Sequence, residues 1–94
     1  RRSRQAKADR WRVGAAMKYV YILQSECGAH FYTGVTGDIE ARLNKHNNGD
    51  LPHTRKHRPW RLRTYVAFDD EARAFAFERY LKSGSGRAFA SKRL

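Results

Sequence analysis

The sequence predicts a small α/β domain in which strands and helices share one hydrophobic core. The strands are predicted because segments 18–24 and 30–35 are rich in aromatic and β-branched residues and are joined by a short Gly-containing loop, as in a hairpin. The helices are predicted because segments 38–48 and 69–82 combine capping residues with apolar residues at helical spacing. With 94 residues, 40% of them hydrophobic, the chain has material for one modest core.

Charge and cysteine content restrict the partner and the compartment. Twenty Lys+Arg against nine Asp+Glu give a net charge of +11, which favours nucleic acid as the partner over an anionic membrane. Cys27 is the single cysteine of the sequence, so neither an internal disulfide nor a cysteine-based zinc cluster is expected. No apolar run approaches the ~20 residues that span a bilayer, and no segment has the pattern of an export signal. We therefore expect a cytoplasmic protein without a membrane role.

The first sixteen residues differ in composition from the rest. They contain six basic residues and one acidic residue, with Trp11 and Val13 as the only sizeable apolar groups. The segment is either a basic arm that touches nucleic acid or an upstream extension. We favour the extension, because a core strand begins directly after Met17. The expected organisation is a disordered leader or extension over 1–16 and a single domain over 17–94.

Segment 18–24 is predicted to be the central strand of the sheet. Its apolar residues occupy both faces, with Tyr19, Tyr21 and Leu23 on one and Val20 and Ile22 on the other. A strand that is apolar on both faces is typical of one covered on both sides. We therefore expect helices to pack against both faces of the sheet.

The helix after the second strand carries two candidate functional residues. Asp38 is a suitable N-cap, Leu43 belongs to the apolar stripe, and residues 47–49 (Asn-Asn-Gly) end the helix. Arg42 and His46 are one helical turn apart and one residue away from that stripe. We expect both side chains at the rim of the buried face, between core and water.

A basic run occupies the predicted loop 50–59 and the start of the predicted strand 60–68. Such a run can be a solvated edge that prevents pairing between sheets. It can also contact phosphates while neighbouring aromatic side chains stack on bases. We favour nucleic-acid contact, because the whole chain is basic. The predicted contact residues, which include two lysines outside the run, are Lys45, Arg55, Lys56, Arg58, Arg61 and Lys82.

Segment 69–82 is predicted to be a substantially buried helix that ends at Gly84. Glu78 stands out in it, because its helical neighbours are apolar and a buried carboxylate must be paired or bound to a metal. An ion pair with Lys82, four residues further on, is the alternative. A short basic helix over 85–94, capped by its first serine, Ser85, is expected to follow.

Together these residues resemble the GIY-YIG nuclease superfamily, specifically its small stand-alone bacterial members. Residues 19–21 (Tyr-Val-Tyr) take the place of the first motif, and residues 32–34 (Tyr-Thr-Gly) take that of the second. Segment 38–46 resembles the helix that follows these motifs, and residues 77–79 resemble the later acidic helix. The resemblance covers about 17–93. Three strand positions depart from the motifs, while the tyrosines that carry chemistry are kept.

The resemblance implies a three-stranded antiparallel sheet flanked by helices, with the site on one face of the sheet. It implies one divalent metal, Mg²⁺ or Mn²⁺, with Glu78 as its protein ligand. Tyr21 would be the general base toward the attacking water, with its pKa lowered by nearby cations, and Tyr32 would orient it. Arg42 would neutralise charge on the phosphate, and His46 would hold a phosphate or polarise the water.

The function so implied is a metal-dependent endonuclease that hydrolyses phosphodiester bonds of nucleic acid, with DNA favoured over RNA. Branched, flapped or damaged DNA in repair or recombination is the candidate substrate. The alternative is a non-catalytic nucleic-acid binding module that keeps the nuclease fold. The two hypotheses differ in one requirement, because only the enzyme needs the Glu78 carboxylate.

Overall fold

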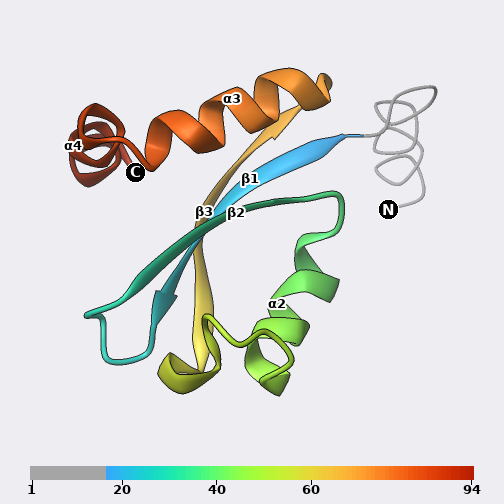
Figure 1. Cartoon of the computed structure of the whole chain (residues 1–94), viewed down its shortest axis with the longest axis vertical. Coiled ribbons are helices and arrows are strands. Elements are labelled where there is room, and N and C mark those ends of the chain that lie inside the picture. Colours follow the sequence, from blue (N-terminus) through green and yellow to red (C-terminus); the bar gives the residue numbers. More distant parts are fainter. Residues whose placement is uncertain (1–16) are drawn as a thin grey trace, which may run out of the picture.

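The structure, a computed structural model, describes residues 17–94, and the predicted leader over 1–16 lies outside the described residues. Three strands form an antiparallel sheet with helices on both faces, as Figure 1 shows. The predicted α/β fold, a small three-stranded sheet flanked by helices, is confirmed. In chain order the elements are β1 (Lys18–Ser25), β2 (Phe31–Thr36), α2 (Ile39–Asn48), the 3₁₀ turn η1 (Arg55–His57), β3 (Trp60–Phe68), α3 (Glu71–Leu81) and α4 (Gly84–Arg93).

β1 is the central strand and pairs antiparallel with both β2 and β3. Val20 and Ile22 pack against α3 on one face, while Tyr21 and Leu23 lie on the face toward α2. The prediction of a central strand covered on both sides is therefore confirmed. The register with β3 shifts between Ile22 and Leu23, so Arg63 is an extra residue on β3 at that point.

Two hydrophobic clusters, one on each face of the sheet, hold the layers together by removing apolar area from water. The cluster under α3 contains Val20, Ile22, Ala74 and Leu81, with Phe77 and Phe89 packed against it. The cluster toward α2 contains Tyr21, Leu23 and Trp60, with Tyr32, Leu43 and Leu62 around it. The second cluster is richer in side chains with polar atoms, and those atoms need partners when they are buried.

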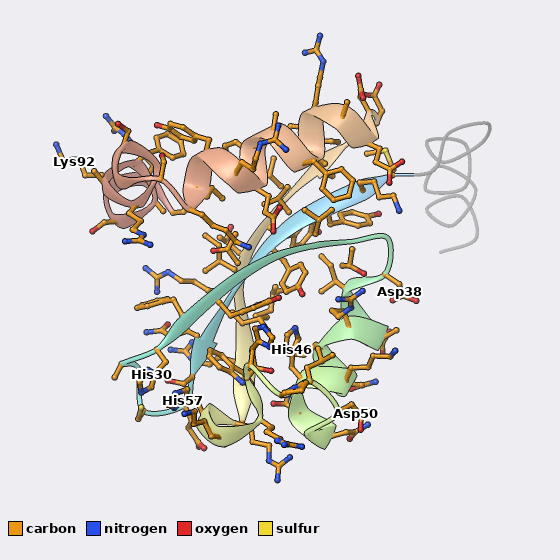
Figure 2. All side chains as sticks on the ribbon, in the orientation of Figure 1. His30, Asp38, His46, Asp50, His57 and Lys92 are labelled. Carbon is orange, nitrogen blue, oxygen red and sulfur yellow. The ribbon has the colours of Figure 1, made fainter. Side chains whose placement is uncertain are left out.

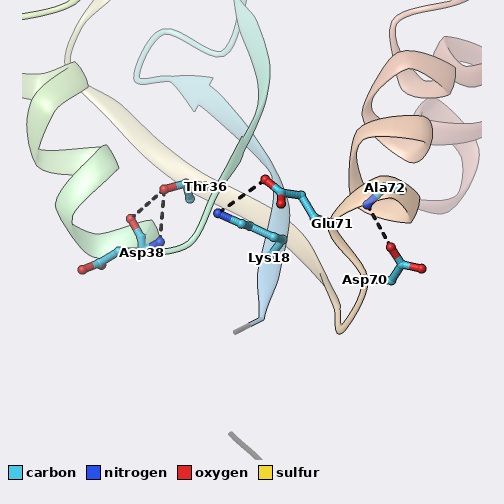
Figure 3. Close-up of polar contacts among 6 residues, drawn as sticks. All are labelled: Lys18, Thr36, Asp38, Asp70, Glu71 and Ala72. Carbon is cyan, nitrogen blue, oxygen red and sulfur yellow. Dashed lines mark hydrogen bonds and ion pairs between the residues drawn. The ribbon is translucent and has the colours of Figure 1, made fainter. Parts of the chain in front are cut away.

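Side-chain caps define where α2 and α3 begin, and Figure 3 shows the bond from Ala72 to the Asp70 cap of α3. Asp38 and Asp70 each accept hydrogen bonds from backbone N–H groups in the first turn of the helix that follows. Thr36 Oγ1 accepts from the Asp38 N–H at 3.1 Å and donates to the Asp38 carbonyl at 3.2 Å. Lys18 and Glu71 form an ion pair 3.9 Å long between β1 and α3. The predicted N-cap of α2 is confirmed, and local sequence sets both helix starts.

The junction between α3 and α4 differs from the prediction. α3 ends at Leu81, and Ser83 caps α4 by accepting from the Gly86 N–H at 3.1 Å. Ser85 is therefore not the cap, and Gly84 is the first residue of α4 instead of the end of α3. The segment Ser-Gly-Ser-Gly offers two equivalent capping patterns, and the earlier serine is the one that turns the chain directly out of α3.

The prediction that α3 is substantially buried is also wrong. Only Ala74 and Leu81 of this helix are buried, whereas Phe75 is 42% exposed and Tyr80 is 41% exposed. The sheet covers one side of α3, and α4 contacts its C-terminal end, so much of the helix faces solvent (Figure 1). Among the helices within residues 17–94, none has the length and apolar character needed to cross a membrane.

Candidate active site

Tyr21 is a core residue of β1 whose hydroxyl finds its partner on α2. Its side chain is 1% exposed, and the hydroxyl oxygen lies 3.1 Å from Nε2 of His46. His46 is fully buried, and Figure 2 shows it on the sheet side of α2. The predicted position of His46 at a rim open to water is therefore wrong, and this imidazole cannot hold a phosphate directly.

The burial of His46 is possible because its second ring nitrogen also has a partner. Nδ1 lies 2.8 Å from the hydroxyl of Thr54, a buried residue of the loop before η1. The Thr54 carbonyl in turn accepts the indole N–H of Trp60 at 2.8 Å. With both nitrogens bonded, the imidazole avoids the cost of an unsatisfied buried polar group. Sequence reasoning missed Thr54, since nothing in its spacing connects it to the helix.

Asn47 fastens the end of α2 to the start of β3. Its side-chain oxygen accepts the Trp60 backbone N–H at 2.6 Å, and its Nδ2 donates to the Trp60 carbonyl at 3.0 Å. These two bonds fix both ends of the loop that contains Thr54. The position of Thr54 against His46 is therefore set by the fold and does not depend on the exposed part of the loop.

Gly34 makes room for the Tyr21 phenol. The two residues are cross-strand partners in the β1–β2 pair. A β-carbon at position 34 would lie 2.6 Å from the phenol oxygen, closer than non-bonded atoms approach. The Tyr-Thr-Gly tripeptide thus places a glycine where Tyr21 crosses β2, and any side chain there would displace the phenol.

Tyr32 and Arg42 flank the Tyr21–His46 pair. The Tyr32 ring centroid lies 4.9 Å from that of His46 and 6.2 Å from that of Tyr21. The Arg42 guanidinium, one turn before His46, lies close enough to the Tyr21 phenol to oppose a rise in its pKa. Four of the five predicted catalytic residues therefore meet on the α2 side of the sheet.

Glu78 approaches from the opposite side. It belongs to α3, which packs against the Val20–Ile22 face of β1. Its side chain is 19% exposed, and Oε2 lies 2.9 Å from Nζ of Lys82, so the ion pair considered from the sequence is formed. The Glu78 charge still raises the pKa of Tyr21. Glu78 therefore belongs to a helix that covers the other face of the sheet from α2, which carries Arg42 and His46.

The pKa values set the proton positions in the resting site. Burial, together with the neighbouring Tyr32, raises the pKa of Tyr21 to about 12 against the opposing effect of Arg42. Burial, and then the charge of Arg42, lowers the pKa of His46. The expectation that cations lower the pKa of Tyr21 is wrong, because burial outweighs the guanidinium. At neutral pH the phenol is protonated and the imidazole is neutral.

A neutral imidazole has one donor nitrogen and one acceptor nitrogen. We assign the phenol hydrogen to His46 Nε2. Nδ1 then carries the ring hydrogen and donates it to the Thr54 hydroxyl. Tyr21, His46 and Thr54 thus form one hydrogen-bonded chain in the core.

Comparisons with known proteins show the family of this chain. The profile of the GIY-YIG catalytic domain matches residues 17–92. The chain belongs to the GIY-YIG family. UPF0213 protein VNG_2274C of Halobacterium salinarum is 36% identical over 67 residues, which are 70% of this chain and 86% of the relative. UPF0213 protein BH0048 of Halalkalibacterium halodurans is 39% identical over 70 residues, which are 73% of each chain.

A solved structure supports the same assignment. The solution NMR structure of UPF0213 protein BH0048 matches with a TM-score of 0.50 and 33% identity, over 81% of this chain and 83% of that one. The predicted resemblance is therefore confirmed, and the GIY-YIG domain relates the chain to the nuclease superfamily.

GIY-YIG nucleases generally use divalent metals, and Glu78 determines which kind of ion this domain fits. Within residues 17–94, no group of three or more His, Cys, Asp or Glu side chains can enclose a metal. A single carboxylate suits Mg²⁺ or Mn²⁺, which retain water and accept phosphate oxygens as further ligands. The residues therefore fit an ion held jointly by Glu78, water and substrate, and they do not fit an all-protein cage.

The six predicted nucleic-acid contacts of the GIY-YIG domain are all exposed, but they form two groups. One group surrounds the end of α2 and η1 and contains Lys45, Arg55, Lys56 and Arg58. A hollow of about 400 Å³ next to η1 is lined by Lys56 and Arg58 together with His30 and His57, whose rings stack 3.6 Å apart (Figure 2). The other group, Arg61 and Lys82, lies on the α3 side of the sheet.

Proposed function

We propose that this GIY-YIG domain is a divalent-metal-dependent endonuclease that hydrolyses phosphodiester bonds of DNA. The observation that carries the proposal is the hydrogen-bonded chain from Tyr21 through His46 to Thr54, together with the charge of Arg42 that acts on the phenol. A phenol that donates to a neutral, buried imidazole has a place to send a proton. The same bonds also satisfy buried polar atoms, so the catalytic role is supported by the charges of Arg42 and Glu78 that act on this phenol.

Proton transfer is the task proposed for this chain. Tyr21 takes a proton from the attacking water as its own hydroxyl proton passes to His46 Nε2. The water oxygen bonds to phosphorus, and the bond from phosphorus to the leaving oxygen breaks. The transfer makes an imidazolium, which the Thr54 hydroxyl stabilises by accepting from Nδ1–H. Tyr32 packs on His46 and keeps the ring aligned with the phenol.

Arg42 and Glu78 counter the negative charge of the phosphate, Arg42 through its guanidinium and Glu78 through a bound metal ion. Arg42 lies beside the phenol, where its guanidinium can neutralise charge that develops on the phosphate oxygens. Glu78 would hold the metal ion, which when bound supplies Lewis-acid stabilisation of the leaving oxygen. Without a metal ion, Lys82 forms an ion pair with Glu78. When a phosphate approaches, Lys82 can pair with the phosphate instead.

Cleavage of a labelled DNA panel tests the proposal. The panel contains single strand, blunt duplex, 5′ flap and four-way junction, each with Mg²⁺, with Mn²⁺ and with EDTA. Wild-type protein should cut at least one substrate only with metal, and Glu78→Gln should remove cutting while retaining binding. Glu71→Gln, an exposed carboxylate of the same helix, is the matched control and should cut normally. Equal cutting by wild type and Glu78→Gln would indicate a contaminating nuclease and reject the proposal.

One observation favours the alternative, a non-catalytic nucleic-acid binding module. Glu78 is already paired with Lys82 at 2.9 Å, an arrangement that satisfies the carboxylate without any metal. That module would bind DNA with strong salt dependence through the exposed basic residues around η1 and show no response to metal beyond screening. Metal-stimulated strand breaks that vanish with EDTA would exclude it.

A further inference from the structure

A cleft of about 640 Å³ adjoins the candidate site, because Tyr32 is one of its lining residues, but Tyr21 and His46 do not line it. Its other lining residues come from the three strands and from the junction of α3 with α4. Its volume is in the range of roughly 300–1,000 Å³ that is typical of ligand sites. The floor includes Ile22, Phe31 and Leu81, and the rim includes Arg63, Lys82 and Arg87.

Phe31 is the most unusual lining residue, because it is a large apolar side chain that is 56% exposed. The guanidinium of Arg63 lies over its ring, 5.7 Å from the centroid. Gln24 holds that guanidinium in place, since its Oε1 accepts from Arg63 at 3.1 Å and from Arg61 at 3.0 Å. An exposed aromatic ring beside a fixed cation is an arrangement on which nucleic-acid bases stack.

The positive charge at the rim of the cleft narrows the class of ligand that the cleft can bind. Three of the cleft-lining residues in the described part of the chain are cationic, and none is Asp or Glu. The floor favours a flat apolar group, and the rim favours negative charge on either side of it. A base between two phosphates combines these features. Lys82 also links the cleft to the site, because it pairs with Glu78 and lines the cleft.

We propose that the cleft receives one unpaired base of a DNA strand, stacked on Phe31, with its flanking phosphates at Arg63 and Arg87. The proposal rests on the proposed function for the identity of the polymer, and it adds the substrate class. A base inside an intact duplex cannot enter the cleft without losing its stacking and pairing. Single-stranded or locally unpaired DNA is therefore the preferred substrate, and intact duplex is disfavoured.

Equilibrium binding in EDTA tests this assignment without hydrolysis. The probes are a fluorescein-labelled single strand and a fully paired blunt duplex, measured by anisotropy. Phe31→Ala and Arg87→Gln should each weaken single-strand binding by at least about fivefold, the effect of losing one stacked base or its phosphate contact, and change duplex binding less than about twofold. Phe31→Trp keeps an aromatic ring and should bind the strand as well as wild type.

Matched controls separate the cleft from general effects of charge and exposed rings. Arg93→Gln removes a cation from the same helix as Arg87, and Phe75→Ala removes an exposed ring from α3. Neither residue lines the cleft, so both variants should bind like wild type. In addition, 2-aminopurine in the strand should be quenched by wild-type protein and less so by Phe31→Ala.

Two results of these measurements would overturn the assignment: unchanged strand binding by Phe31→Ala, or equal weakening of strand and duplex binding. A third would come from a parallel assay with vesicles of anionic phospholipid, if Phe31→Ala weakened binding to the vesicles alone. The last result would assign the cleft to a lipid surface. The binding assays contain EDTA and no metal, so their result does not depend on whether the protein cleaves DNA. Strand binding through Phe31 with no cleavage under any metal condition would remove the enzyme and keep the base-binding cleft.

Discussion

The Tyr21 hydroxyl and the His46 imidazole lie 3.1 Å apart, and both side chains are excluded from solvent. Because Thr54 bonds the other ring nitrogen, both nitrogens of the imidazole have partners and its orientation is fixed. A buried chain of this kind costs stability when one member is removed, since its partner is left without a hydrogen bond. It therefore couples the proposed chemistry to the stability of the fold.

Thr54→Val keeps the shape of the side chain and removes its hydroxyl. We expect the free energy of unfolding to fall by about 1–3 kcal/mol, because Nδ1–H of His46 loses its acceptor. Cleavage should fall as well, since the imidazolium loses its stabilising contact. Thr54→Ser restores the hydroxyl and should recover both properties. NMR of the ring nitrogens is the measurement, and an unchanged His46 tautomer in Thr54→Val would contradict the assigned role.

Gly34→Ala tests the space that the phenol requires. The added methyl would lie 2.6 Å from the Tyr21 oxygen, so either the phenol or β2 must move. We expect a loss of about 1–3 kcal/mol in unfolding free energy and a loss of cleavage. Gly84→Ala is the matched control, because a methyl there meets no atom within 4 Å. Thermal unfolding and cleavage of both variants decide the matter, and full activity of Gly34→Ala would refute the close approach.

The raised pKa of Tyr21 predicts behaviour at alkaline pH. Its folded pKa of about 12 lies above the ordinary value of 10.0, so the native state holds this proton more tightly than the unfolded state. The resulting stability is complete below pH 10 and is lost as the pH rises through 12. Tyrosinate absorbance of wild type minus that of Tyr21→Phe isolates this group. A difference spectrum that titrates near pH 10 would contradict the burial effect.

The lowered pKa of His46 predicts the opposite behaviour in acid. Below its ordinary value of 6.5 the unfolded state takes up a proton that the folded state resists. The stability due to neutral His46 is therefore complete above pH 6.5 and is lost as the pH falls toward the folded pKa. Urea unfolding at pH 7.5 and pH 5 should show a smaller acid loss in His46→Gln than in wild type. His53→Gln, at an exposed residue, is the control.

The Glu78–Lys82 ion pair predicts competition with metal. Lys82→Gln removes a charge that lies 2.9 Å from the carboxylate. Mn²⁺ affinity, measured by calorimetry without DNA, should rise about two- to fivefold, the amount expected for an ion pair worth up to about 1 kcal/mol. Lys92→Gln is the control, since Figure 2 shows Lys92 on the far side of α4. Binding that is unaffected by Glu78→Gln would show that the ion is held elsewhere.

Local signals in the sequence were sufficient to predict most of the strands and helices. Aromatic and β-branched residues on both faces predicted β1, and alternating residues predicted β3. Asp38 with Gly49 predicted the ends of α2, because helix caps depend on neighbours in the chain. The junction of α3 and α4 was wrong because two serines offered similar caps. The choice between them depends on how α4 packs against α3.

The candidate site was predicted in part. Tyr21, Tyr32, Arg42 and His46 were selected from the resemblance to the motifs, and the structure brings them together. Their roles stay predictions. The full burial of His46 could not be predicted, because it depends on Thr54, eight residues away on a loop without periodicity. Glu78 lay on the opposite face for a similar reason, since helical spacing does not say which side of a sheet a helix covers.

The pair of hydrogen bonds between Asn47 and Trp60 has a consequence for how such domains can diversify. The bonds close the loop at its base, where Thr54 is buried, and leave Arg55 and Lys56 exposed on η1. Substitutions or small insertions among the exposed residues of η1 therefore leave the hydrogen bonds between Asn47 and Trp60 in place. The charge of η1 can vary while the contact between His46 and Thr54 is kept.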